Sequence, residues 1–372
     1  MTYDLNLIKD YVGFSDGLVV KNPATGEVIA NVKSYSAAET QDAIECASVA
    51  FKEWSSRTAK ERSSVLRKWY ELIMENQDAL AAICTAECGK PLFESKGEVA
   101  YAASFIEWFA EEGKRLYGDI IPTHANGKRI LALKQPIGVI AAITPWNFPL
   151  AMITRKVGPA LAAGCTAVVK PAEATPLSAL ALEALALQAG VPQGVLKTIT
   201  TNNPIEVGGI FTSHPIIKKI SFTGSTAVGK LLMKQSADTV KKVSMELGGN
   251  APFIVFDDAD IDAAVAGAMV SKYRNAGQTC VCANRFYIHE NIHDEFVAKF
   301  KTAIEALKIG NGADDGVDIG PVINAAAVDK ISALVALTKK SGANIILGGE
   351  RHNAGDNYYA PTLITGVTMD ME

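Results

Sequence analysis

The sequence predicts an α/β protein built around a doubly wound parallel sheet, with a second α/β unit after it. Short β-branched runs alternate with longer stretches in which apolar residues recur at helical spacing. Two of these helical stretches end in glycine, the residue that most often closes a helix. The 372 residues amount to about two and a half domains at roughly 150 residues per domain.

A long helical segment is predicted ahead of the sheet. From Ala37 to about Glu112 apolar residues recur at helical spacing, and Ser or Thr stands where helix caps are expected. A hairpin follows, because Asn126-Gly127 favours a two-residue turn and the alternating strand 130–136 comes after it. We expect this hairpin to project from the body of the protein.

Four runs are predicted to be strands of the parallel sheet, buried on both faces. The strands are 138–144, 166–170, 194–200 and 217–222, and the helices between them include 151–164 and 177–190. Ligands bind to such sheets at the loops that follow the carboxyl ends of the strands. Functional residues are therefore expected in those loops.

The second α/β unit is predicted to begin near Gly248-Gly249. No internal repeat or low-complexity tract is evident. The expected strands are 251–256, 285–290 and 344–349, and the expected helices are 261–273, 294–307 and 329–340. These boundaries divide the chain into 1–116 with 137–247, the hairpin 117–136, and 248–372.

The composition excludes several function classes. Hydrophobic residues make up 48% and charged residues 20%, the balance of an ordinary globular protein. The formal charge of −4, from 36 basic and 40 acidic residues, argues against nucleic-acid binding. No stretch approaches the ~20 apolar residues of a membrane span. The first ten residues are acidic where a targeting peptide is basic, so a cytoplasmic location is expected.

The six cysteines predict neither a disulfide framework nor a metal site. They are few for the length of the chain, and a cytoplasmic protein keeps its thiols reduced. Cys84 and Cys88 are one helical turn apart, but no second pair of His or Cys at ligand spacing accompanies them. Packing in the core is the expected role of most of them.

The loop after the first strand of the sheet, PWNFP (145–149), places an asparagine between two prolines. Such a stiff corner can present the Asn147 amide as a fixed donor to an oxyanion. An Asx-turn that caps the next helix is an equally open interpretation.

A glycine-spaced turn into a helix, FTGSTAVGK (222–230), follows the fourth strand. The spacing of Gly224 and Gly229 is not the dinucleotide pattern G-x-G-x-x-G, but the N–H groups of the helix start and the Ser225 hydroxyl would suit a phosphate. A plain tight turn is the alternative. Lys170 ends another strand, where it would contact a ribose or phosphate unless it is simply exposed.

Two further loops carry groups for acid–base and nucleophilic chemistry. Glu246, in SMELGGN, has apolar and glycine neighbours that would suit a general base. A solvent-facing glutamate at the end of a helix or strand is the alternative. Cys280, in GQTCVC, follows a helix and a flexible glycine, a position that suits a nucleophilic thiol. A buried, inert thiol is the alternative there.

Together, and in this order, these motifs resemble those of the aldehyde dehydrogenase superfamily. The resemblance extends from NPATGEVIA (22–30) to YYAPTLI (358–364). It implies a Rossmann-like NAD(P)-binding domain (1–116 and 137–247), a catalytic domain (248–372), and a hairpin arm that builds homodimers or homotetramers. It also implies a small-molecule aldehyde as the substrate.

The resemblance assigns roles to individual residues. Cys280 matches the nucleophile, Glu246 the base that activates water for thioester hydrolysis, and Asn147 the oxyanion donor together with the Cys280 backbone N–H. The cofactor contacts that it implies are Trp146 beside the cofactor, Lys170 and Glu173 at the adenosine ribose, and Gly224, Ser225 and Gly229 at the pyrophosphate. Because Glu173 would repel a 2′-phosphate, NAD is expected to bind better than NADP.

Two strings, NFPLAMITRKVGPALAAGC and KYRNAGQTCVCANR, are similar to those of the succinate-semialdehyde dehydrogenase branch. This similarity places Arg155 and Arg274 where members of the branch bind the substrate carboxylate. Succinate semialdehyde is therefore the first expected substrate and glutarate semialdehyde the second. A surface or domain-interface ion pair is the alternative for each arginine.

The chain also departs from the family pattern. ITTNNP (199–204) replaces the usual Thr-Gly turn, and the sequence stops before a Glu-Ile-Phe-Gly-Pro-like motif, so the catalytic domain is expected to be incomplete. A truncated, weakly active or inactive nucleotide-binding or interaction protein is the alternative to an active enzyme. Cys282 is predicted to form a reducible disulfide with Cys280, or else to pack in the core.

Overall fold

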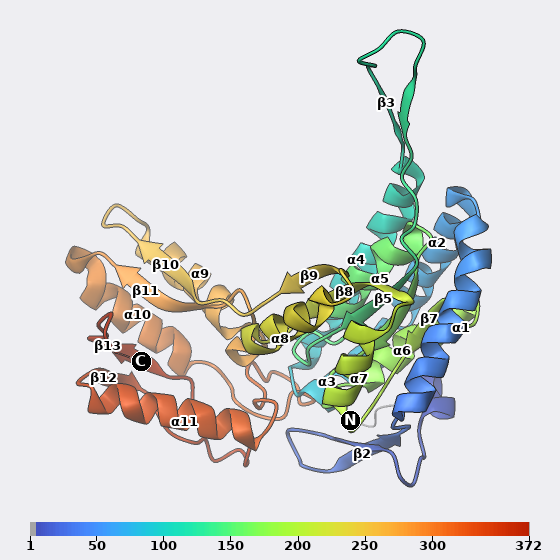
Figure 1. Cartoon of the computed structure of the whole chain (residues 1–372). Helices are drawn as coiled ribbons and strands as arrows, with labels where there is room; N and C mark the ends of the chain where they lie inside the picture. Colours follow the sequence, from blue (N-terminus) through green and yellow to red (C-terminus); the bar gives the residue numbers. More distant parts are fainter. Residues whose placement is uncertain (1–4, 372) are drawn as a thin grey trace.

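The computed structural model describes residues 5–371, and residues 1–4 and 372 lie outside that description. Figure 1 shows two lobes, one that contains the large sheet and most of the helices and one formed by the segment from β10 (Ala251–Val255) onward. A two-stranded hairpin projects from the first lobe (Figure 1). Within residues 5–371, no helix is long and apolar enough to cross a membrane.

The large sheet has five strands in the order β7-β6-β5-β8-β9, and all neighbouring strands are parallel. Their bounds are β5 (Val139–Ile143), β6 (Thr166–Lys170), β7 (Leu196–Thr198), β8 (Ile217–Thr223) and β9 (Lys242–Glu246). The chain leaves β5 toward β6 and β7 and then returns to the other side of β5 for β8 and β9. The predicted doubly wound sheet is therefore confirmed, with its topological switch point between β5 and β8.

The fifth strand, β9, has no long β-branched run that predicts a strand. Its sequence KVSME is partly exposed at the edge of the sheet. It pairs in regular register with β8, from Lys219↔Lys242 to Thr223↔Glu246. Backbone pairing with a neighbour, rather than a side-chain pattern of its own, therefore accounts for this strand.

Helices cover both faces of the sheet. The connecting helices are α5 (Ala151–Ala162), α6 (Leu177–Ala189), α7 (Pro204–Ser213) and α8 (Thr226–Ala237). Alternate residues of β5 belong to two different cores, since Ile140 and Ala142 pack with α5 and α6 whereas Val139 and Ala141 pack with α1 (Ala37–Ser56) and α7. This division is the period-two alternation of a strand that is buried on both faces.

The segment 37–112 consists of four helices, which confirms the helical prediction. They are α1, α2 (Ala59–Glu75), α3 (Gln77–Cys88) and α4 (Leu92–Glu112). Capping boxes start the first two, formed by Ser36 with Glu39 and by Thr58 with Glu61. The third ends at Gly89, which adopts a φ of 85°. A small antiparallel pair, β1 (Leu18–Lys21) and β2 (Val28–Val32), precedes them.

The projecting hairpin consists of β3 (Asp119–Ile121) and β4 (Ile130–Ala132), which pair antiparallel. The pairing ends at Ile121↔Ile130, so residues 122–129 form a loop. Only Gly127 of the Asn126-Gly127 pair has a positive φ, whereas the expected turn requires positive φ at both residues. The predicted hairpin is present, but the prediction of a two-residue turn is wrong.

The second lobe pairs β10 in parallel with β11 (Ala283–Ile288), and two of its three helices, α9 (Ile261–Tyr273) and α10 (His293–Glu305), pack against this pair. In the third helix, α11 (Ala325–Lys340), Val335 instead lies near Gly349, just after β12 (Asn344–Leu347). The last strand is β13 (Leu363–Thr365). Short 3-10 segments are η1 (Asn6–Tyr11), η2 (Gly113–Arg115), η3 (Arg274–Gly277) and η4 (Glu290–Ile292). The assignment of these lobes to cofactor binding and catalysis stays a prediction.

Candidate active site

The loops singled out in the sequence meet at one edge of the large sheet. Lys170 ends β6, the PWNFP loop follows β5, Gly224 follows β8, and Glu246 ends β9. Because β6, β5, β8 and β9 are successive neighbours and all parallel, their carboxyl ends lie side by side. This edge includes the switch point, where doubly wound sheets bind their ligands.

The turn after β8 leads into the exposed N-terminus of α8. The Ser225 hydroxyl caps this helix by accepting the Val228 N–H at 3.4 Å, and the Gly224 N–H donates to the Glu246 carbonyl at 3.1 Å. A Cβ at Gly229 would lie 2.5 Å from the Leu247 side chain, so glycine lets the helix approach β9 closely. The helix start thus offers backbone N–H groups to an anion, as a cofactor pyrophosphate requires.

Lys170 is buried at the end of β6, with 6% of its surface exposed. The interpretation of an exposed lysine is therefore wrong. Its ammonium donates to the Pro171 carbonyl at 2.9 Å and pairs with the Glu173 carboxylate. Glu173 is itself partly exposed, so its carboxylate can still meet a ligand at this edge.

Cys280 is exposed on the loop between η3 and β11, so the interpretation of a buried, inert thiol is wrong. Just before it, Asn275, Ala276 and Gly277 have φ values of 52°, 55° and 78°. The left-handed region is unfavourable for alanine, and three such residues in a row are uncommon. Backbone strain of this kind clusters at functional sites.

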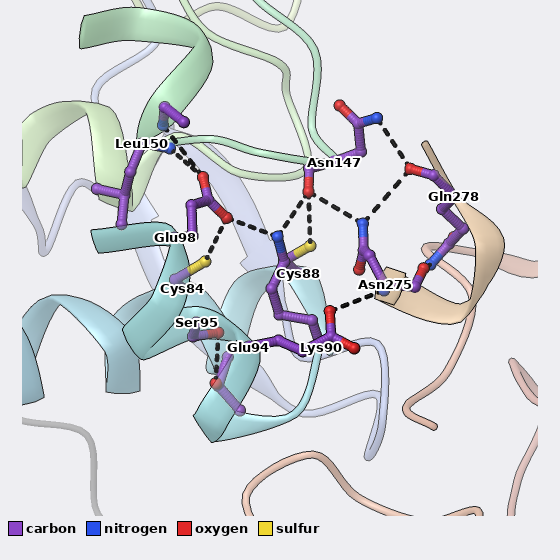
Figure 2. Close-up of polar contacts among 12 residues, drawn as sticks. Cys84, Cys88, Lys90, Glu94, Ser95, Glu98, Asn147, Leu150, Asn275 and Gln278 are labelled. Carbon is purple, nitrogen blue, oxygen red and sulfur yellow. Dashed lines mark hydrogen bonds and ion pairs between the residues drawn. The ribbon is translucent and has the colours of Figure 1, made fainter. Parts of the chain in front are cut away.

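Asn147 joins the PWNFP loop to the cysteine loop. Its side-chain Nδ2 donates to the Gln278 carbonyl at 2.9 Å, and the Asn275 Nδ2 donates to the Asn147 carbonyl at 3.0 Å (Figure 2). The Asn147 Oδ1 is buried and accepts no hydrogen bond among the described residues. Asn147 therefore does not cap α5, and the Asx-turn interpretation is wrong.

Glu246 is exposed at the end of the edge strand, which is the solvent-facing position of the alternative interpretation. The segment that follows it lies against the cysteine loop, because a Cβ at Gly249 would come within 3.1 Å of the Cys280 carbonyl oxygen. The backbone thus brings the candidate base and the candidate nucleophile to the same region. Its role as a base stays a prediction.

The two candidate substrate arginines lie on elements next to the PWNFP loop. Arg155, in α5, stacks on the Phe105 ring at 5.2 Å, and Arg274 stacks on the Phe148 ring at 4.5 Å. Within residues 5–371 neither guanidinium forms an ion pair. The ion-pair alternative is therefore wrong for both. Trp146 is half-buried in the same loop.

The cysteines are all free thiols. Cys282 is buried, and its thiol donates to the Lys272 carbonyl at 3.2 Å, so a disulfide with the exposed Cys280 would require the loop to rearrange. Its redox role stays a prediction.

Cys84 and Cys88 belong to α3 and are both buried. In the described part of the chain, no three His, Cys, Asp or Glu side chains are grouped as a metal site requires.

Three charged residues near the site were not predicted from the sequence. Lys156, in α5, is buried with its ammonium 3.3 Å from the Ser221 hydroxyl. Burial lowers the pKa of Lys156 to about 8, although the negative charge of Glu246 acts to raise it. Lys90 and Glu98 form a buried ion pair beneath Asn147 (Figure 2). For Lys156 and Glu98 the available signal was a charged residue inside an otherwise apolar helical pattern, which is costly to bury unless it is paired. Lys90, in the connection between α3 and α4, gave no such signal.

The profile of the aldehyde dehydrogenase family matches residues 13–372. Over 348 residues the chain is 58% identical to the glutarate-semialdehyde dehydrogenase of Pseudomonas aeruginosa, a match that covers 94% of this chain and 72% of that protein. Over 352 residues it is 56% identical to the NADP(+) succinate-semialdehyde dehydrogenase of Escherichia coli, covering 95% of this chain and 73% of that protein.

The similarity extends to the three-dimensional structure. It superposes on a crystal structure described as an NADP dependent enzyme of E. coli with a TM-score of 0.97 and 53% sequence identity, covering 100% of this chain and 79% of that one. The family profile spans nearly the whole chain, and the dehydrogenases of P. aeruginosa and E. coli are each more than half identical to it over the matched residues. The chain is therefore an oxidoreductase of the aldehyde dehydrogenase family.

Proposed function

We propose that the chain oxidises an ω-carboxy aldehyde to the acid with NAD(P), with succinate semialdehyde as the first substrate and glutarate semialdehyde as the second. The observation that carries the proposal is the 2.9 Å hydrogen bond from the Asn147 amide to the Gln278 carbonyl, which joins the PWNFP loop to the loop of the exposed Cys280 thiol. The similarity to relatives named for glutarate and succinate semialdehyde supports the substrate class.

The first step is attack of the Cys280 thiolate on the aldehyde carbon. A carbon–sulfur bond forms, and the carbonyl oxygen takes the electron pair and becomes an oxyanion. The free Nδ2 hydrogen of Asn147 and the Cys280 backbone N–H donate to this oxyanion. The role needs a neutral amide that is already oriented, and the bond to Gln278 supplies that orientation.

When bound, the cofactor NAD(P) would supply the acceptor for the hydride that leaves the reacting carbon. Glu246 then removes a proton from the water that attacks the resulting Cys280 thioester. The carbon–sulfur bond breaks, the thiolate leaves, and the acid is released. A carboxylate at the exposed end of β9 has access to water for this step.

The residues at the carboxyl edge of the sheet fit such a cofactor. The exposed start of α8, with Gly224, Ser225 and Gly229, would bind the pyrophosphate, and Trp146 would lie beside the cofactor. The Lys170–Glu173 pair would contact the adenosine ribose. We further propose that NAD binds better than NADP, because the Glu173 carboxylate opposes a 2′-phosphate.

Arg155 and Arg274 support a substrate that carries its own carboxylate. Each guanidinium stacks on an aromatic ring yet has no acidic partner among residues 5–371. A guanidinium that is fixed but unpaired is suited to a bidentate contact with a carboxylate. The distal carboxylate of a short ω-carboxy aldehyde would supply that partner.

The test compares Arg274→Leu with the wild type on two aldehydes of equal chain length. The variant is expected to raise KM for succinate semialdehyde about 10-fold or more, because it loses a charge-assisted hydrogen bond to the substrate carboxylate. KM for uncharged butanal should change little. Arg351→Leu is the control, because Arg351 pairs with Asp329 away from the site. Equal losses on both aldehydes would make Arg274 structural, and NAD binding without turnover would favour the nucleotide-binding alternative.

A further inference from the structure

We propose that the buried Lys90–Glu98 ion pair is a positioning pair for the oxyanion donor Asn147. This inference rests on the proposed function, in which the Asn147 amide donates to the oxyanion. Neither Lys90 nor Glu98 touches the reacting atoms in this scheme. They act on Asn147 through the backbone of the PWNFP loop.

Lys90 contacts that backbone directly. Its side chain is fully buried, and its Nζ donates to Glu98 at 2.5 Å and to the Asn147 carbonyl at 2.7 Å (Figure 2). The same ammonium lies 4.0 Å from the centre of the Phe148 ring. One cation therefore contacts two successive residues of the loop.

Glu98 fixes the other end of the same loop. One carboxylate oxygen accepts the N–H groups of Leu150 and Ala151 at 2.9 and 3.2 Å, where α5 begins. The other oxygen accepts from Lys90. Since α5 has no side-chain cap of its own, Glu98 supplies the missing acceptor from α4. The segment from Asn147 to Ala151 is thus bound at both ends by one ion pair.

The same face of α4 also positions the cysteine loop. Glu94, one helical turn before Glu98, accepts the Asn275 N–H at 2.7 Å, and Asn275 in turn donates to the Asn147 carbonyl. Helix α4 therefore binds both the loop of the amide donor, through Glu98, and the loop of the thiol, through Glu94 (Figure 2). Lys90 and Asn275 share the Asn147 carbonyl as their acceptor.

Stability alone is a weak reason for such a pair. Replacing a buried ion pair by apolar residues of similar volume is often neutral or stabilising, because both charges lose their hydration. Apolar residues would fill the space but would not donate to the Asn147 carbonyl. Small displacements of a catalytic group are costly, about 100-fold for 1 Å. The pair therefore suits a role in fixing the position of the Asn147 amide relative to the Cys280 thiol.

The experiment measures two reactions of Cys280 on the full chain. Acylation by 4-nitrophenyl acetate passes through an oxyanion, whereas alkylation by iodoacetamide does not. Acylation is followed as nitrophenolate release, with Cys280→Ala as the blank. Alkylation is quantified on the Cys280 peptide by mass spectrometry, because Cys46 is also exposed.

Lys90→Met is expected to slow acylation about 10–100-fold and to leave alkylation nearly unchanged, because only the first reaction uses the amide. Glu98→Gln keeps a neutral acceptor for α5 and should give a smaller loss, so it tests the proposal even if Lys90→Met does not fold. Added to Asn147→Ala, Lys90→Met should cost acylation nothing more. Lys197→Met is the matched control, since Lys197 pairs with the buried Glu183 away from the loop.

Three results would overturn the proposal. These are wild-type acylation in both Lys90→Met and Glu98→Gln, an equal loss of acylation and alkylation, or losses that multiply with that of Asn147→Ala. Failure of the proposed function is separate, because it would appear as unchanged acylation in Asn147→Ala alone. In that case the inference about the pair would fall with it.

Discussion

Two buried glutamates, Glu87 and Glu98, supply acceptors to helices that have no cap of their own. Glu87 accepts the N–H groups of Leu177 and Ser178 at 2.7 and 2.9 Å, at the start of α6, as Glu98 does for α5. These partners are 90 and 91 residues from Glu87 along the chain. Capping rules use residues adjacent to the helix, so the sequence could not predict either contact.

Glu87 makes the stability depend on pH in an unusual direction. Burial raises its pKa from 4.5 to about 8, against the opposing effect of its hydrogen bonds. The folded protein therefore binds a proton that the unfolded chain has released between these values. This contribution to stability is complete below pH 4.5 and is lost as the pH rises toward 8, by up to about 1.4 kcal/mol per pH unit.

Glu87→Gln should remove this slope, because the amide does not titrate. We expect the free energy of unfolding of the wild type to fall more steeply than that of the variant between pH 5 and 8. Urea unfolding at several pH values measures both slopes. Parallel slopes would show that Glu87 does not titrate in that range.

Glu173 is the residue expected to set the cofactor preference. A carboxylate 4 Å from a phosphate costs about 1 kcal/mol even in bulk water, or about 5-fold in Kd. The ion pair with Lys170 reduces this effect. The wild type should bind NADP more weakly than NAD in calorimetric titrations, and Glu173→Gln should narrow the difference. Equal affinities in the wild type would contradict the preference.

At the scale of elements, strands with a strong hydrophobic pattern could be predicted and the others could not. TAVVK is buried at every position and is a strand over the predicted residues Thr166–Lys170. β9, with the sequence KVSME, lacks such a pattern and depends on pairing with its neighbour β8. The hairpin was predicted, but its loop geometry was not: pairing ends at Ile121↔Ile130, because the next residue, Pro122, has no N–H with which to continue the ladder.

The η3 turn before Cys280 carries strain that a substitution can release. Ala276 has a φ of 55°, a conformation that costs an L-residue about 1–2 kcal/mol and glycine almost nothing. Glycine also adds about 0.4–1 kcal/mol of unfolded-state entropy, which reduces the gain. Ala276→Gly is therefore expected to raise the free energy of unfolding by about 0.5–1 kcal/mol.

Urea denaturation measures this change, and Ala298→Gly is its control. Ala298 is exposed in the interior of α10, where the same substitution should lower stability by about 1 kcal/mol. Opposite signs at the two positions would support strain at Ala276. A loss of similar size at both would show that the left-handed turn costs alanine nothing there.

At the scale of the whole molecule, the candidate site depends on contacts between segments far apart in the sequence. Asn147 and Gln278 are 131 residues apart, yet they are hydrogen-bonded. Motifs predicted which loops carry chemical groups, because strand-end loops can be recognised locally. They could not predict Lys90 or Glu98, whose contacts with the Asn147 loop arise only when α4 packs against α5.

The hairpin of β3 and β4 exposes a row of large apolar side chains. Ile120, Leu131 and Leu133 are 83%, 63% and 77% exposed. Burying a side chain of this size contributes about 1.5–3 kcal/mol, so three of them on each of two chains would provide a substantial drive for association. Contiguous exposed apolar residues mark interaction sites. The hairpin is therefore expected to join copies of the chain into a dimer or tetramer.

Replacing Ile120, Leu131 and Leu133 by serine tests this expectation. The triple variant should shift the mass measured by light scattering after size exclusion toward the monomer, with an unchanged far-UV circular dichroism spectrum, because the three side chains contribute little to the core of one chain. Ile205→Ser is the control, since Ile205 is 84% exposed on α7 away from the hairpin. A monomeric wild type, or a triple variant that keeps the wild-type mass, would show that the hairpin does not mediate association.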